Sequence, residues 1–182
     1  MFKKVLFLIL LISSAAIAQE KKPKKEPKPV LHEVSNKDVV QSIFSEAVKV
    51  EKANDYWFNI YDKDNNILGY AMSSLPYCKN VKGYNNLTPV MILTDKNWVI
   101  KKVSLLTHWE TIGYIKKLEK KGFFNLWVGK NLKQAKSVKP DGYTGATCTA
   151  IAVSKNVDFL LEKGSKSLPV KPLTNNNNNT RN

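Results

Sequence analysis

The stretch "TPVMILTDKNWVIKKVSLL", residues 88–106, decides the fold class. It contains two apolar segments, 88–94 and 98–106, and the short polar sequence "DKN" (95–97) between them is typical of a tight connection. Both segments are rich in Val, Ile and Leu, which favour central strands of a sheet. The sequence therefore predicts a β-hairpin whose two strands are central ones.

A second hairpin is predicted upstream of the first. The segments "YWFNIY" (56–61) and "ILGYAMS" (67–73) flank the turn-rich "DKDNN" (62–66). Asp and Asn in such a turn accept hydrogen bonds from their own backbone, so Asp62 and Asp64 are interpreted as turn residues rather than metal ligands. Two successive hairpins predict a largely antiparallel sheet.

Helical patterns lie on both sides of the hairpins in the sequence. Residues 35–53 begin with a Ser cap, have an acid three residues later and carry apolar residues at helical spacing, which predicts an amphipathic helix. Helices are also predicted in 111–122, with a stop at Gly122, and in 150–164, with a stop at Gly164. We therefore expect an α+β fold, a single domain in which helices pack on an antiparallel sheet.

The ends of the chain have compositions unlike that of a packed domain. Residues 1–18 combine lysines, an apolar run and small residues, which predicts a signal peptide. Retention as an anchor is the alternative, although the apolar run is shorter than the roughly 20 residues that span a bilayer. We expect a Lys/Pro-rich linker at 19–30, one folded domain at 31–168 and a disordered Asn-rich tail at 169–182.

The formal net charge of +14 suggests an anionic partner. Export argues against nucleic acid as that partner. The lysine pairs are scattered along the chain, which is typical of solvated faces, while association with an anionic membrane surface stays open.

The chain has two cysteines, Cys78 and Cys148. An oxidising compartment would permit a disulfide between them. Two cysteines give no spacing pattern, so separate packing as small apolar residues is the favoured interpretation.

The sequence contains none of the familiar catalytic motifs. The hydroxyls of Thr144, Thr147 and Thr149 have only His32 and His108 as possible imidazole partners, and there is no nucleophile-elbow, P-loop or dinucleotide-binding glycine pattern. This favours chemistry supplied by an attached group.

The stretch "DGYTGAT" (141–147) matches the flavinylation pattern D-x-x-[S/T]-G-A-T, and the chain thereby resembles the FMN-binding domain family. That family includes the covalent flavin subunits of the sodium-translocating NADH:quinone oxidoreductase and of Rnf-type complexes, and the periplasmic domain of the nitrous-oxide reductase regulator. The resemblance implies covalent FMN on Thr147 through a phosphoester bond, added by a flavin transferase. It further implies that the transferase reads Asp141 and Thr144, and that the motif residues Asp141, Thr144, Gly145 and Ala146 bind the cofactor.

Three further segments resemble the family in the right order: "GYNNLTPVMIL" (83–93), "VIKKVSLLTHWETIGY" (99–114) and "FFNLWVGKNL" (123–132). The chain departs from the family pattern at Ile112, Cys148 and Ala150. In the family the loop within the second segment lies against the flavin. The resemblance therefore implies that several of its residues are neighbours of the cofactor, namely His108, Glu110, Thr111 and Gly113.

Other roles are open for these residues. His108 is alternatively a solvated loop residue, and Glu110 either tunes the flavin or pairs with a lysine. The aromatic candidates for a shelf under the flavin are Tyr84, Trp109 and Tyr114.

The motif also has a physical interpretation. A helix beginning near Thr149 would place its positive end close to Thr147 and stabilise a phosphodiester there. The alternative is an unmodified turn with Thr149 as the helix cap.

We therefore expect an exported covalent flavoprotein that carries electrons between membrane or soluble redox partners, in the periplasm or on the extracytoplasmic face of the membrane. It is expected to be an electron carrier rather than a stand-alone enzyme. The alternatives are a flavin-dependent reductase of a small extracytoplasmic substrate and a non-flavinylated basic domain that binds the cell envelope.

Overall fold

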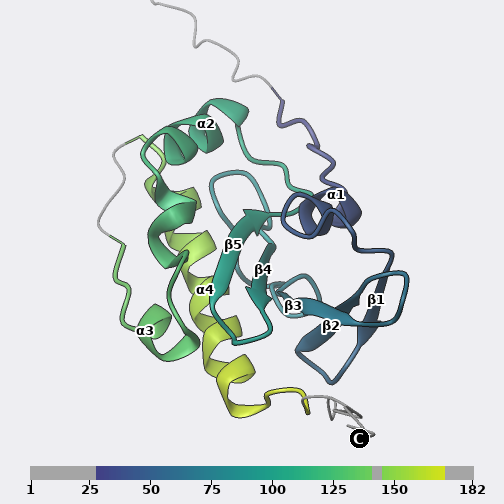
Figure 1. The fold of residues 1–182 in the computed structure, drawn as a ribbon. Helices are drawn as coiled ribbons and strands as arrows, with labels where there is room; N and C mark the ends of the chain where they lie inside the picture. Colours follow the sequence, from purple (N-terminus) through teal and green to yellow (C-terminus); the bar gives the residue numbers. More distant parts are fainter. Residues whose placement is uncertain (1–27, 141–144, 171–182) are drawn as a thin grey trace, which may run out of the picture.

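The structure is a computed structural model that describes residues 28–140 and 145–170 (Figure 1). It contains one five-stranded antiparallel sheet in the order β1-β2-β3-β4-β5, with helices packed on it. The predicted α+β class is confirmed. The expected signal peptide at 1–18 lies outside the described residues, and the domain boundaries stay predictions.

Both hairpins form where the sequence predicts them. The strands of the sheet are β1 (Lys49–Lys52), β2 (Trp57–Tyr61), β3 (Ile67–Ser73), β4 (Val90–Asp95) and β5 (Ile100–Leu105), each antiparallel to the next.

The turn between β2 and β3 is built as the sequence indicates. Asp62 Oδ1 accepts hydrogen bonds from the N–H groups of Asp64 (2.9 Å) and Asn66 (2.8 Å). Asn65 takes the left-handed conformation, with φ of 59°. The interpretation of Asp62 and Asp64 as turn residues is confirmed.

The second hairpin differs from the prediction in one respect, because β5 is an edge strand rather than a central one. Its apolar residues Ile100, Val103 and Leu105 are nevertheless buried. Helices covering one face of the sheet bury these side chains, so apolar composition does not by itself identify a central strand.

The helix predicted over 35–53 is wrong in its second half. Ser35 caps it as expected, but α1 spans only Asn36–Gln41 and the chain then turns and forms β1. Ser42 ends the helix by donating its hydroxyl to the carbonyl of Val39 at 2.6 Å. The β-branched Val50 lies in β1, where it pairs with Ile60 of β2.

Four further helices follow the sheet: α2 (Ile112–Lys120), the 3₁₀ helix η1 (Phe123–Trp127), α3 (Leu132–Lys136) and α4 (Thr147–Lys166). Gly122 follows α2 with φ of 68°, as its predicted stop requires. Gly164 does not end α4, which continues to Lys166. A Cβ at Gly164 would lie 2.3 Å from Met72 Sδ, so this glycine lets the helix approach the sheet closely.

Two apolar cores lie on opposite faces of the sheet. The larger core is formed by α2, η1 and α4 with residues such as Trp57, Met72 and Ile92. The smaller one lies under α1 and includes Ile60 and Leu93. Figure 1 shows α4 running along one side of β3, β4 and β5, with α1 on the other side.

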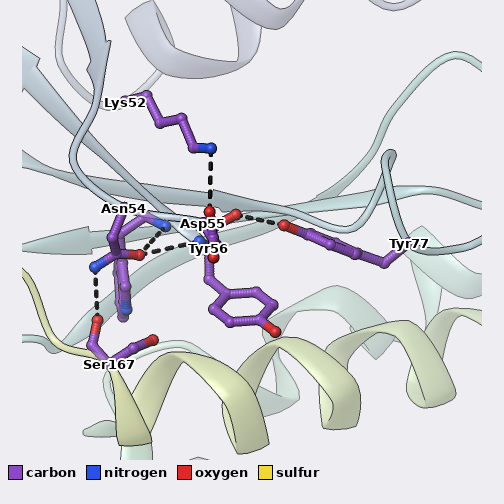
Figure 2. A network of polar contacts seen from close by, with 7 residues as sticks. Lys52, Asn54, Asp55, Tyr56, Tyr77 and Ser167 are labelled. Carbon is purple, nitrogen blue, oxygen red and sulfur yellow. Dashed lines mark hydrogen bonds and ion pairs between the residues drawn. The ribbon is translucent and has the colours of Figure 1, made fainter.

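The C-terminal end of α4 is fastened to the loop between β1 and β2 (Figure 2). Asn54 Nδ2 donates to the carbonyl of Ser167 at 2.8 Å, while Asn54 Oδ1 accepts from the N–H groups of Tyr56 and Trp57, both at 3.0 Å. The Trp57 indole donates to the carbonyl of Gly164 at 3.0 Å. These contacts fix α4 along its axis, and with it the position of the opposite end, where Thr147 lies.

Both cysteines are free: Cys78 is buried and Cys148 is exposed. This agrees with separate packing rather than a disulfide. No helix in residues 28–140 and 145–170 combines the length and apolar character needed to cross a membrane.

Candidate functional site

Thr147 is the first residue of α4 and its side chain is exposed. The segment before it turns through Gly145, which has φ of 83°, a conformation that favours glycine. Thr149 is fully buried and is the third residue of the helix, not its cap. Of these two threonines, only Thr147 is exposed; Asp141 and Thr144 lie outside the described residues.

A small cavity of about 220 Å³ opens beside Thr147. The rings of Tyr84 and Tyr114 meet edge to face in its wall, with centroids 5.2 Å apart and planes at 87°. These are two of the three aromatic residues that the sequence suggested, and Trp109 is not among those that line the cavity. The complete lining is Tyr84, Tyr114, Gly145, Ala146, Thr147, Cys148 and Thr149.

The surroundings of Thr147 suit an anion. The N-cap residue is Ala146, whose methyl group offers no oxygen to the first turn, and that turn carries no acidic side chain. No side chain of the first turn therefore neutralises the positive end of the helix dipole, and among the described residues the carboxylate bonded to that turn is Glu110, which accepts the hydroxyl of the buried Thr149. Lys117 lies across the gap from α2, since a Cβ built on Gly145 would be 3.0 Å from its Nζ.

Glu110 lies behind this cavity and is fully buried. Its carboxylate accepts hydrogen bonds from the N–H groups of Asn85 (2.9 Å) and Tyr84 (3.2 Å), and from the hydroxyl of Thr149. Among the described residues, no lysine forms the ion pair with Glu110 that the sequence left open. Glu110 does not line the cavity, so a direct contact with a flavin stays a prediction.

His108 is buried, with 4% of its surface exposed, so its interpretation as a solvated loop residue is wrong. Its ring lies 5.1 Å from that of His32, and its Nδ1 accepts the N–H of Glu110 at 3.0 Å. Burial, and secondarily His32, lowers the pKa of His108 below its ordinary 6.5, while Glu110 opposes the shift. The neutral ring acts here as a hydrogen-bond acceptor that orients the loop before α2.

The remaining predicted neighbours lie near the start of α2. Thr111 is its N-cap residue and accepts a hydrogen bond from Asn85 Nδ2 at 3.3 Å. Gly113 is exposed, with open space where the methyl group of an alanine would lie. Neither residue lines the cavity, and their contacts with a cofactor stay predictions.

Sequence reasoning missed Lys117 and Asn85. Lys117 is one of four lysines in 116–121, and only the structure places it opposite Gly145. Asn85 contacts Glu110 through its backbone N–H, for which the sequence has no signal, and its side-chain amide donates to the carbonyl of Trp109 at 2.9 Å.

A comparison with known families identifies the domain, because residues 83–162 match the model of the FMN-binding domain family. The chain carries an FMN-binding domain. The match begins at Gly83, includes Glu110 and Thr147, and ends near the last turn of α4. The resemblance seen in the sequence is therefore confirmed, and the domain is that of a flavoprotein.

Among solved structures, the chain is similar to the crystal structure of Shewanella oneidensis NqrC, with a TM-score of 0.38 and 17% sequence identity. The similarity covers 77% of this chain and 84% of that one. No curated protein matches the sequence.

The geometry of the FMN-binding domain fits part of the cofactor closely. The end of α4 and Lys117 suit the phosphate, and the two tyrosines provide flat apolar surface. Sites that enclose a whole ligand of this kind are usually larger, about 300–1,000 Å³. A cavity of about 220 Å³ would thus enclose only part of FMN and leave the rest at the surface.

Proposed function

We propose that this chain is an exported electron carrier in which FMN is joined to Thr147 through a phosphoester bond. The observation that carries the proposal is the placement of the exposed Thr147 at the positive end of α4, in the wall of a cavity with two tyrosines. The matching motif and the family assignment support the same residue.

Attachment requires an enzyme to reach this hydroxyl. A flavin transferase that takes FMN from FAD with magnesium would join Thr147 Oγ to the phosphorus of the FMN half. The bond to the AMP half breaks, AMP leaves, and the hydroxyl proton passes to a base. The exposure of Thr147 permits this reaction, whereas Thr149 is enclosed and hydrogen-bonded to Glu110. The motif residues Asp141 and Thr144 are proposed to be read by the transferase.

The residues around the attachment point would bind and orient the group rather than react. The helix end and Lys117 neutralise the phosphate charge, and Tyr84 with Tyr114 packs against the apolar part of the cofactor. FMN itself supplies the redox chemistry when bound. Glu110, Thr111 and Gly113 are proposed to support the site from the loop before α2 and from its first turn.

The carrier role is favoured because a cavity of about 220 Å³ would hold only part of FMN, which leaves little room in it for a small substrate. Turnover of such a substrate by the isolated protein would favour the reductase instead.

The proposed location is the periplasm or the extracytoplasmic face of the membrane. The predicted signal peptide at 1–18 and the net charge of +14 support export and contact with an anionic membrane surface. Membrane-bound or soluble redox proteins are the proposed donor and acceptor.

In-gel flavin fluorescence of the denatured chain tests the proposal. The protein is coproduced with an active flavin transferase, as the wild type, as Thr147→Ala or as Cys148→Ala. The cysteine is the matched control because it is exposed and lines the same cavity, and its thiol is another possible attachment point. We expect fluorescence in the wild type and in Cys148→Ala, and none in Thr147→Ala. A dark wild-type band beside a fluorescent control flavoprotein would favour the envelope-binding alternative.

A further inference from the structure

Glu110 is an unusual feature of the site because it is a fully buried carboxylate held by neutral donors. In residues 28–140 and 145–170, none of the ion pairs of the structure includes it. Burying a carboxylate is costly unless hydrogen bonds replace its water. The burial of the Glu110 carboxylate therefore needs a structural explanation.

The donors to Glu110 come from two segments that are far apart in the sequence. One is the loop at 84–86, whose backbone N–H groups point at both carboxylate oxygens, at 2.9 Å for Asn85, 3.2 Å for Tyr84 and a weaker 3.5 Å for Asn86. The other is the first turn of α4, through the hydroxyl of Thr149. Each segment provides one wall of the cavity beside Thr147.

The chemistry of the side chain suits this link. A carboxylate accepts on both oxygens and donates nothing, whereas the amide of glutamine would turn an NH₂ group toward an N–H or O–H donor. Hydrogen bonds to a charged acceptor are also stronger than neutral ones. A glutamate therefore holds both walls, and an isosteric glutamine does not.

We propose that Glu110 is a positioning residue that couples the Tyr84 loop to the first turn of α4 and so fixes the opening of the FMN cavity. The proposal rests on the proposed function for its consequence, which is that the hydroxyl of Thr147 is presented to FMN at a fixed distance from the Tyr84 ring. Glu110 acts through these two walls and not through contact with the flavin.

The coupling is tested in the protein without FMN by hydrogen exchange of the amides at 84–86. The variant is Thr149→Val, which removes one donor from the α4 side and leaves the loop itself unchanged. The matched control is Thr94→Val, because Thr94 is equally buried but its hydroxyl makes no hydrogen bond within the described structure.

We expect protection at 84–86 to fall by about tenfold in Thr149→Val, the factor for loss of one buried hydrogen bond, and to stay unchanged in Thr94→Val. Glu110→Gln should give a larger loss, and the Thr149 variant decides the matter if that protein does not fold. Unchanged exchange at 84–86 in Thr149→Val would overturn the proposal.

The FMN yield supplies a second readout. With the transferase present, Thr149→Val should take up FMN more slowly than Thr94→Val at equal folded content, and equal rates would overturn the proposed consequence. If wild-type protein takes up no FMN at all, the proposed function fails, while the exchange measurement still decides whether Glu110 couples the two walls.

Discussion

Replacement of Gly83 by alanine should disturb the domain by crowding the side chains of Glu110 and Thr88. The backbone of Gly83 is not in the left-handed region, so the change causes no conformational strain. A Cβ there would lie 2.6 Å from Glu110 Oε1 and 2.7 Å from Thr88 Cγ2. Real contacts of this kind are longer than 3.0 Å, so the carboxylate must move by at least about 0.4 Å, away from donors that are already at hydrogen-bond distance.

The cost follows from two effects. Overpacking of a filled site costs about 1–3 kcal/mol, and weakening a hydrogen bond to a carboxylate adds about 1 kcal/mol. Alanine recovers about 0.4–1 kcal/mol by restricting the unfolded chain. The net loss is about 2 kcal/mol of unfolding free energy, which lowers the melting temperature of a domain of this size by about 8 °C.

The matched control is Gly113→Ala, which lies in α2 with open space around its Cβ. It should raise stability by about 0.5–1 kcal/mol, because alanine favours the helix. Urea unfolding of the protein without FMN, followed by circular dichroism, measures both variants. Equal midpoints for the two variants would refute the view that Glu110 is held rigidly beside Gly83.

Three further predictions concern the same domain. The pKa of His108 is lowered in the folded protein, so the unfolded chain binds more protons below about pH 6.5 than the folded protein does. The stability that His108 contributes should therefore be full above that pH and fall as the pH decreases. Urea titrations at about pH 5 and about pH 8 measure this difference, and His108→Asn should reduce it. Asn156→Ala should cost about 2–3 kcal/mol in the same assay, because it leaves the buried carbonyl of Thr88 without its donor at 2.9 Å; a loss below about 0.5 kcal/mol would contradict this. Lys117→Gln should slow FMN uptake by up to about fivefold, as expected for an exposed ion pair, while Lys116→Gln leaves the rate unchanged.

The parts of the fold that could be predicted are those with a strong local signal. The two hairpins have apolar strands and turns built from Asp and Asn, and α2 has both helical spacing and a terminal glycine. The strand β1 gave no such signal, because all four of its residues are exposed at the sheet edge. Its one valine, Val50, lies within the span 35–53 that was predicted to be helical, and pairing with β2 decided the outcome.

Gly164 illustrates a second limit. A glycine after an apolar helical pattern is typical of a helix end, yet here it lies inside α4 and makes room for Met72 and Trp57. Such a contact joins residues about 90–110 positions apart, so only the tertiary structure reveals it.

The candidate site likewise has a part that a local motif predicts and a part that depends on tertiary contacts. Thr147 was found from its motif, and the structure places it at a helix start two residues earlier than expected. The role of Glu110 was not found, because its partners are mostly backbone N–H groups, which every loop possesses.

Peptide mass spectrometry of the protein produced with an active flavin transferase tests the central claim most directly. We predict that the peptide containing Thr147 gains the mass of one esterified FMN, that fragmentation places it on Thr147 rather than on Cys148 or Thr149, and that Thr147→Ala abolishes it. An unmodified Thr147 in folded protein, with a control substrate fully flavinylated in the same cells, would contradict the claim.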